Sequence, residues 1–479
     1  MGLGLTCAVV LGAALRFHHL GKESLWLDEA FSVQLAHSSL STIVTETAKD
    51  VHPPLYYVAL HYWVRVAGDS ERAVRLLSAL ASIATIVVLC RLATHLFGRA
   101  TGVTAAFFAA VSPFQVEFAQ EARMYALLAL FSVSSIYFLV RLLDARERHR
   151  RWVFAGYVLT TTLMMYTQVY SVFIVTAEAL VLVSTIVAST PDSRRLAKIA
   201  ALGLAIAVLL FLPWLPILLR QIFHVQRGFW ISGQTPGTLA DMFVLYAGSD
   251  RLAWMLSGLA VLGIAAGVVV RRAPATSRRL TMAVALLWLA CPILLPLVIS
   301  RFSEPIFLPK YTIVGSLAFI VLAARGATIL PGALRAWGAI AMVAVAACWS
   351  WTPLHDYYAA TRKVEWREAV ANVDRVAHAQ DVVLFNQPYA KIPFDYYSHR
   401  SDVVKVPFLK DHDDLGERSL TEVLTMDVRG HDRVWLVLSN PDELSPLMVR
   451  QLTRSFQMSS HTASPGLEIY LFVRPARQK

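Results

Sequence analysis

Apolar runs separated by short basic gaps fill most of residues 1–352. Many of these runs approach the ~20 residues that a helix needs to cross the ~30 Å hydrocarbon core of a bilayer. The pattern predicts eleven membrane-spanning helices, at residues 3–19, 72–90, 101–117, 124–141, 152–167, 170–189, 199–219, 252–270, 280–299, 311–324 and 336–352. We therefore expect a polytopic α-helical membrane protein.

Arginine and lysine concentrate in five of the gaps between these runs, at residues 91–99, 141–151, 193–198, 271–279 and 325–335. Short loops rich in these residues stay on the cytoplasmic side of a membrane. If these five basic gaps lie on the cytoplasmic side, the N-terminus is in the cytoplasm and the C-terminus is outside. The net charge of +11 thus indicates topology. It does not indicate nucleic-acid binding, because no soluble basic face with interleaved aromatic residues accompanies it.

The longest predicted outer segment, residues 20–71, contains two apolar stretches with helical periodicity. Residues 38–50 show the periodicity directly, and residues 53–68 carry two prolines in the first turn, where a missing N–H costs least. Both stretches are expected to form helices that lie in the membrane interface. Two further outer segments follow, at residues 220–251 and 301–310.

Residues 353–479 differ in character, because charged residues become frequent there. The stretch 365–378 predicts an amphipathic helix, and three short apolar runs predict buried strands at residues 381–385, 433–439 and 467–473. The pattern predicts a small extracytoplasmic α/β domain after a membrane domain of residues 1–352.

Composition supports the membrane assignment. Only 16% of the 479 residues are charged, whereas soluble proteins carry about a quarter. All four cysteines fall in apolar segments, so no disulfide framework is expected in the hydrophilic parts. No small-residue cleavage site follows the first apolar run, which is therefore expected to remain as the first span.

Four polar clusters fall on the predicted outer side: Asp28 with Glu29, residues 50–57, residues 117–125 and residues 304–311. Ionisable groups at this depth are costly and suggest function. Their meeting at one boundary between water and membrane predicts a site there.

Asp28 and Glu29 stand among Trp26, Leu27 and Phe31. A single acid here would be an interfacial carboxylate, either solvated or paired with an arginine. Two adjacent acids in apolar surroundings favour another interpretation, because a partly desolvated carboxylate accepts a proton more readily. The pair is thus a candidate base for a substrate hydroxyl.

His52 precedes the two prolines and has three interpretations: a substrate contact, a helix cap or, less favoured, a metal ligand. An aromatic belt at the interface explains Tyr56 and Tyr57. Arg123 either pairs with an acid such as Glu121 to close a helical hairpin or clamps an anion.

Glu117 and Glu121 are expected four residues apart on one helix face. Arg301 and Lys310 lie on the predicted outer side, where basic residues are disfavoured. They therefore need an anionic partner, and a lipid phosphate supplies one.

Four motifs, in this order, resemble those of the GT-C glycosyltransferases: LWLDEAFS (25–32), DVHPPLYY (50–57), QEARMYALL (120–128) and FLPKYT (307–312). The likeness is strongest to bacterial members related to protein O-mannosyltransferases and aminoarabinose transferases. The C-terminal KVEWREAVANV is also similar. Such enzymes move a sugar from a polyprenyl phosphate to an acceptor outside the cytoplasmic membrane.

The resemblance implies roles for residues of this chain. Asp28 matches the acidic residue that acts as base, with Glu29 as its neighbour, and Lys310 would meet the lipid phosphate. The substrate-binding residues implied by the motifs are His52, Tyr56, Tyr57, Glu121, Arg123, Tyr125, Arg301, Lys310 and Tyr311. Relatives often have histidine where this chain has Gln168, which puts a metal site there in doubt. Tyr56 and Tyr57 replace the glycine and lysine of O-mannosyltransferases, so a protein acceptor is not implied.

The chemistry agrees with these residue types. A sugar phosphate leaves as a stabilised anion, so the site needs one base for the acceptor and positive charge for the phosphate. A single base opposite the leaving group implies inversion at the anomeric carbon. We therefore expect an inverting hexosyl- or pentosyltransferase that requires no cofactor, although a divalent metal at His52 with Glu29 stays open.

The expected partners are a polyprenyl-phosphate sugar, a glycan, lipid or protein acceptor, and membrane lipids. The expected location is the bacterial cytoplasmic membrane, with the site and the C-terminal domain outside. A secondary transporter is the alternative from another functional class, but transporters typically contain inverted repeats and broken helices near the midplane of the membrane. A polymerase or ligase for lipid-linked glycans is the alternative among enzymes.

Overall fold

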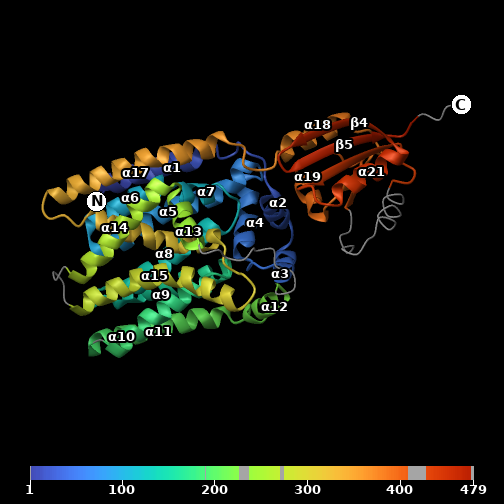
Figure 1. Ribbon diagram of the computed structural model, residues 1–479. Coiled ribbons are helices and arrows are strands. Elements are labelled where there is room, and N and C mark those ends of the chain that lie inside the picture. Colours follow the sequence, from blue (N-terminus) through green and yellow to red (C-terminus); the bar gives the residue numbers. More distant parts are fainter. Residues whose placement is uncertain (1, 189, 226–236, 270–274, 408–427, 476–479) are drawn as a thin grey trace. The chain divides into compact units, whose positions relative to one another are not determined.

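The computed structural model of the chain describes residues 2–188, 190–225, 237–269, 275–407 and 428–475 (Figure 1). The chain divides into two compact units. The first comprises Met1–Leu20 and Ser38–Ala360, and the second comprises Gly21–His37 and Thr361–Lys479. The predicted domains, residues 1–352 and 353–479, differ from this division in where residues 21–37 and 353–360 belong.

The first unit consists of helices. Their bounds are α1 (Gly2–Phe17), α3 (Leu40–Lys49), α4 (Leu55–Ala67), α5 (Glu71–Phe97), α6 (Arg99–Val111), α7 (Pro113–Ala119), α8 (Tyr125–Leu143), α9 (Arg150–Thr167), α10 (Ser171–Ala188), α11 (Pro191–Phe211), α12 (Leu215–Val225), α13 (Thr238–Ala247), α14 (Asp250–Val269), α15 (Ala275–Phe302), η1 (Pro309–Thr312), α16 (Ile313–Ala327) and α17 (Leu334–Ala359). The predicted interfacial helices correspond to α3 and α4. Part of the predicted outer segment 220–251 lies outside the described residues.

A helix overlaps each of the eleven predicted spans. Within the described residues, six helices are long and apolar enough to cross a membrane, or up to eight if each of two bent pairs is one span. The total of eleven spans therefore stays a prediction, while the mostly helical character of the unit and the presence of helices that could cross a membrane are confirmed.

Proline breaks one predicted span. The axes of α6 and α7 differ by 61° across Ser112, because Pro113 has no N–H to continue the helix and disfavours helical geometry in the residue before it. The short α7 then ends at Ala119, and Glu121 lies in the turn that follows. The prediction that Glu117 and Glu121 share one helix face is therefore wrong.

Two glycines allow α14 and α16 to approach closely. A Cβ added at Gly326 would lie 1.8 Å from the carbonyl oxygen of Leu259, and one added at Gly263 would lie 2.2 Å from that of Leu322. Small residues of this kind let helix backbones touch within a membrane, where packing drives association.

A buried arginine ties three helices together. Arg16 of α1 is 1% exposed, and its Nε donates to Ser82 Oγ of α5 at 2.8 Å. Its other nitrogens donate to the carbonyl oxygens of Gly12, Ala109 and Ala110. The charge is thus held by neutral acceptors, which satisfies a guanidinium that water does not reach.

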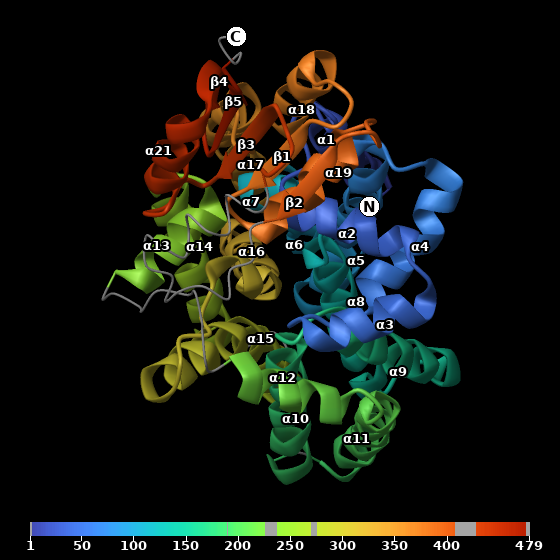
Figure 2. The same ribbon diagram turned by 90° about the vertical axis from the view of Figure 1, so that its right-hand side faces the viewer.

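The second unit is built on a five-stranded sheet of order β2-β1-β3-β5-β4. The strand bounds are β1 (Val382–Phe385), β2 (Val404–Pro407), β3 (Arg433–Ser439), β4 (Gln457–Ser464) and β5 (Leu467–Val473). Strand β1 pairs in parallel with β2 and β3, and β5 pairs antiparallel with β3 and β4. Figure 2 shows this sheet between α18 (Trp366–Val376) and α21 (Ser445–Ser455).

The sheet covers two apolar cores, one on each face. Trp366 of α18, Phe394 of α19 (Lys391–Tyr397) and Trp435 of β3 belong to one core, and Met448 of α21 belongs to the other. The predicted helix at 365–378 and the three predicted strands are confirmed as α18, β1, β3 and β5. The strands β2 and β4 were not predicted because they lack a buried apolar run.

Candidate functional site

Three turns of the first unit carry the motif residues. His52 lies between α3 and α4, Arg123 lies between α7 and α8, and Lys310 lies in η1, directly before α16. The side chains meet although they are far apart in the sequence. The ring of His52 contacts that of Tyr311 edge-on, with centroids 6.1 Å apart, and the positive charges of Arg123 and Lys310 act on the same imidazole.

Aromatic rings surround the ammonium group of Lys310. Its Nζ lies 5.9 Å from the ring centroid of Tyr125 and 5.7 Å from that of Tyr311. These two rings are stacked, with centroids 6.2 Å apart, and Tyr170 contacts Tyr311 edge-on at 5.1 Å. Each ring face attracts the cation within about 6 Å, so the ammonium group is held at a defined place.

Arg123 is also fixed from several directions. Its side chain is 5% exposed, and its Nη1 donates to Tyr57 Oη at 3.4 Å. Its carbonyl oxygen accepts a hydrogen bond from Ser78 Oγ of α5 at 3.2 Å. The ring of Tyr56 contacts that of Tyr57 at 5.8 Å. Tyr57 of α4, interpreted from sequence as part of an aromatic belt, thus contacts the guanidinium group, and Tyr56 packs against Tyr57.

His52 is held in its neutral form. Burial is the first cause that lowers its pKa well below the ordinary value of 6.5, and the positive charges of Arg123 and Lys310 are the second and third. Its Nδ1 is buried and has no hydrogen-bond partner among the described residues. A neutral imidazole can offer one nitrogen as donor and the other as acceptor.

We define the cation cluster as His52, Tyr57, Arg123, Tyr125, Lys310 and Tyr311, which these contacts bring together. Tyr56 borders it through Tyr57. Two other predicted site residues have different surroundings: Glu121 is partly exposed in the turn before α8, and Arg301 is exposed in the last turn of α15. Arg301 makes no hydrogen bond or ion pair with another side chain among the described residues.

The predicted acids belong to the second unit, in the first turn of α2 (Leu27–His37). Asp28 is partly exposed, and its carbonyl oxygen accepts a hydrogen bond from Ser32 Oγ at 2.8 Å. Glu29 is fully buried, and its Oε2 lies 3.0 Å from Lys363 Nζ. The two neighbours thus have different environments, because Asp28 is partly exposed and Glu29 is in a buried ion pair.

Sequence reasoning missed Lys363. Lys363 begins the stretch KVEWREAVANV, but no local pattern identifies it as the partner of Glu29, because the two are 334 positions apart in the chain. Tyr170 also lies beside the cation cluster, because its ring packs on that of Tyr311.

Metal-ligand geometry is absent from the part of the chain that the structure describes: no group of three or more His, Cys, Asp or Glu side chains there is arranged to hold an ion. Gln168, at the position where histidine was discussed, is buried, and its Oε1 accepts a hydrogen bond from the Tyr170 backbone N–H.

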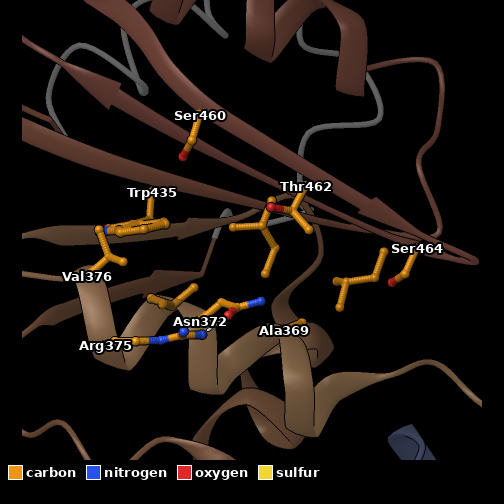
Figure 3. A pocket seen from close by; sticks show the side chains of 11 residues that line it. Ala369, Asn372, Arg375, Val376, Trp435, Ser460, Thr462 and Ser464 are labelled. Atoms are coloured by element: carbon orange, nitrogen blue, oxygen red, sulfur yellow. Dashed lines mark hydrogen bonds between the residues drawn. The ribbon is translucent and has the colours of Figure 1, made fainter.

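A cavity of about 330 Å³ lies in the second unit between α18 and the edge strand β4. Figure 3 shows its polar lining, which includes Asn372, Arg375, Ser460, Thr462 and Ser464, beside the indole of Trp435. None of the predicted site residues lines this cavity.

Comparison with known proteins identifies the fold. Residues 51–217 match the family model described as dolichyl-phosphate-mannose-protein mannosyltransferase. The structure is similar to ArnT from Cupriavidus metallidurans in the apo state (TM-score 0.66, 13% identity) and bound to undecaprenyl phosphate (TM-score 0.67, 15% identity), with 97% of each chain covered in both cases. The chain has the GT-C fold. The predicted resemblance to the GT-C glycosyltransferases is thereby confirmed.

A structure with lower sequence identity is also similar to this chain. An oligosaccharyltransferase from Archaeoglobus fulgidus matches with TM-score 0.62 and 11% identity, covering 98% of this chain and 72% of that chain. A comparison with curated protein sequences finds no match. Together with the apolar helices, the GT-C fold makes this chain a multi-pass membrane protein.

Proposed function

We propose that the chain is an inverting glycosyltransferase, transferring a hexosyl or pentosyl group from a polyprenyl-phosphate donor to an acceptor hydroxyl. The reaction takes place at the outer face of a bacterial cytoplasmic membrane, where the sugar donor arrives within the lipid and the acceptor through water. Lipid-linked sugar transfer is the chemistry of the GT-C superfamily whose fold this chain has.

The cation cluster is the observation that carries this proposal. Arg123 and Lys310, from separate turns, act on one buried imidazole. A phosphate bound beside both cations would accept charge-assisted hydrogen bonds from them. The similarity to ArnT bound to undecaprenyl phosphate supports a lipid phosphate as the occupant.

In the proposed reaction, the carboxylate of Asp28 takes the proton of the acceptor hydroxyl while the hydroxyl oxygen attacks the anomeric carbon. The bond from that carbon to the phosphate oxygen breaks, and the electron pair leaves with the phosphate. Lys310 and Arg123 stabilise the departing anion, so no general acid is needed. Attack opposite the leaving group inverts the anomeric configuration.

We assign the base to Asp28 alone, although both acids were candidates. The carboxylate of Glu29 is fully buried and ion-paired with Lys363, and a base must reach the proton that it removes. Neutral His52 offers a hydrogen bond to the donor. The proposed steps themselves require no metal. Tyr56, Tyr57, Glu121 and Arg301 stay proposed substrate contacts.

A transporter is the second candidate, and one observation favours it. The two bent helix pairs, with angles of 61° and 72°, are the kind of broken helix that transporters use at a binding site. A transporter would move a labelled lipid or sugar across a vesicle membrane without forming a glycosidic bond.

The test is transfer of radiolabelled sugar from a panel of polyprenyl-phosphate donors by purified protein in detergent. We expect labelled product with wild type, near-background product with Asp28→Asn, and wild-type product with Asp69→Asn, a matched change at an exposed acid of the first outer segment. No product with any donor, together with passage of label across vesicles, contradicts the proposal and favours the transporter.

A further inference from the structure

The segment that carries Asp28 is bound by the C-terminal domain. Residues 21–37 form one compact unit with residues 361–479, and α2 packs against α19. The first outer segment is therefore divided: its beginning belongs to the fold of a domain that follows more than 300 positions later.

Backbone contacts fix the residues just before α2. The N–H of Leu25 donates to Tyr397 Oη of α19 at 2.7 Å. Ser24 Oγ accepts a hydrogen bond from the N–H of Arg367 at 3.2 Å, at the start of α18. The approach to α2 is thus held by both helices that cover this face of the sheet.

The carboxylate of Glu23 extends this attachment. It accepts hydrogen bonds from the N–H groups of Arg362 and Lys363. In addition, the guanidinium group of Arg367 lies 3.4 Å from the carbonyl oxygens of Lys22 and Gly21. Contacts to each of residues 21–25 leave little freedom in where α2 begins.

The ion pair between Glu29 and Lys363 fixes how α2 is turned. The Glu29 side chain is 0% exposed, the Lys363 side chain is 12% exposed, and the charged atoms lie 3.0 Å apart. Successive residues of an α-helix project about 100° apart around its axis. Holding Glu29 inward against Lys363 therefore directs Asp28 to a different side of α2, where it is partly exposed.

We propose that Lys363 is a positioning residue for glycosyl transfer: through Glu29 it sets the orientation of α2 and hence the direction of the Asp28 carboxylate. This inference rests on the proposed function for its catalytic consequence. Its structural part, the restraint of α2 by the C-terminal domain, does not depend on any activity.

The test compares Lys363→Met and Lys363→Arg with wild type. Lys391→Met serves as matched control, since Lys391 belongs to the same domain and pairs with Asp395 at the surface. Because misplacing a catalytic group by about 1 Å costs on the order of 100-fold, we expect Lys363→Met to lower kcat by about 10- to 100-fold while KM for the donor stays near wild type. Lys363→Arg retains the charge and is expected to restore most of kcat.

Amide hydrogen exchange supplies the readout that needs no activity. We expect exchange in residues 27–37 to rise about tenfold in Lys363→Met and to stay at the wild-type rate in Lys391→Met, because opening of a segment follows the loss of its restraints. The single change Glu29→Gln should raise it similarly, and adding Lys363→Met to Glu29→Gln should add little.

The outcomes separate the two proposals. Wild-type kcat and wild-type exchange in Lys363→Met would overturn the positioning role even if Asp28→Asn is inactive. Full transfer by Asp28→Asn would overturn the base assignment while the exchange result still decides whether Lys363 restrains α2. Loss of folded protein in Lys363→Met, seen as aggregation, is checked with Glu29→Gln, whose exchange at the wild-type rate would contradict the restraint.

Discussion

Replacing Lys310 by methionine tests the phosphate site directly. Methionine keeps most of the length and the apolar character of the side chain and loses the ammonium group, which lies beside the rings of Tyr125 and Tyr311. If the ammonium group binds the lipid phosphate, the variant should bind polyprenyl phosphate more weakly.

The expected magnitude follows from the contacts. A hydrogen bond to a charged group contributes about 1.5–3 kcal/mol, which corresponds to a rise in Kd of roughly 10- to 150-fold. The two cation–ring contacts are worth about 0.5–1 kcal/mol each. Because they exist without ligand, their loss should lower the free energy of unfolding and leave the Kd ratio unaffected.

Tryptophan fluorescence or calorimetric titration of a short-chain polyprenyl phosphate into detergent-solubilised protein measures this Kd. Lys310→Arg keeps the charge and should stay within a few-fold of wild type. Lys49→Met is the matched control, because Lys49 is exposed and pairs with Glu46 on α3. An unchanged Kd in Lys310→Met would refute the assignment of the phosphate to this lysine.

Three further predictions concern packing, pH and metal. Gly326→Ala should destabilise the protein by about 1–3 kcal/mol, because the new Cβ would meet the carbonyl of Leu259, whereas Gly258→Ala, which faces open space, should leave the thermal midpoint unchanged or slightly higher. The pKa of His52 is lowered on folding, so protonation favours the unfolded state. The contribution of neutral His52 to stability should be present above about pH 6.5 and be lost as the pH falls toward the folded-state pKa. His52→Asn should therefore make the thermal midpoint less sensitive to acid, and equal acid sensitivity in both proteins would contradict this. Finally, transfer should survive EDTA, and recovery of a lost activity on adding Mg²⁺ or Mn²⁺ would show that a metal is required.

The helices of the first unit could be predicted because lipid imposes a simple rule. Every backbone group in the hydrocarbon must be bonded within the chain, so apolar runs of sufficient length become helices. The rule does not locate their ends. Helix α17 continues through Pro353 to Ala359, although charge frequency alone placed the change of domain at residue 353.

The C-terminal sheet could be predicted only in part. Strands β1 and β3 are largely buried, so they appear as apolar runs. Strand β4 is almost wholly exposed at the sheet edge, and its Ser and Thr residues carry no periodic apolar signal. Its place is decided by pairing with β5, which a local pattern does not reveal.

The candidate site could be predicted from the order of the motifs and the chemistry of their residues. The contacts within it could not. The rarity of basic residues on the outer side pointed to Arg301 and Lys310, because such residues need an anion there, and of these two only Lys310 belongs to the cation cluster. The tyrosines around that lysine, Tyr125 and Tyr311, were implied by motif position alone. The burial of Glu29 against Lys363 is a contact between segments 334 positions apart, and only the folded chain distinguishes Glu29 from its neighbour Asp28.

Single-turnover transfer in Asp28→Asn, measured with labelled donor already bound, tests the central claim most directly. General-base catalysis contributes about 10²- to 10⁴-fold. We predict a loss of that size in the rate of product formation, with the Kd for polyprenyl phosphate unchanged. A wild-type rate from the bound donor would contradict the account, because the proton would then leave the acceptor without residue 28.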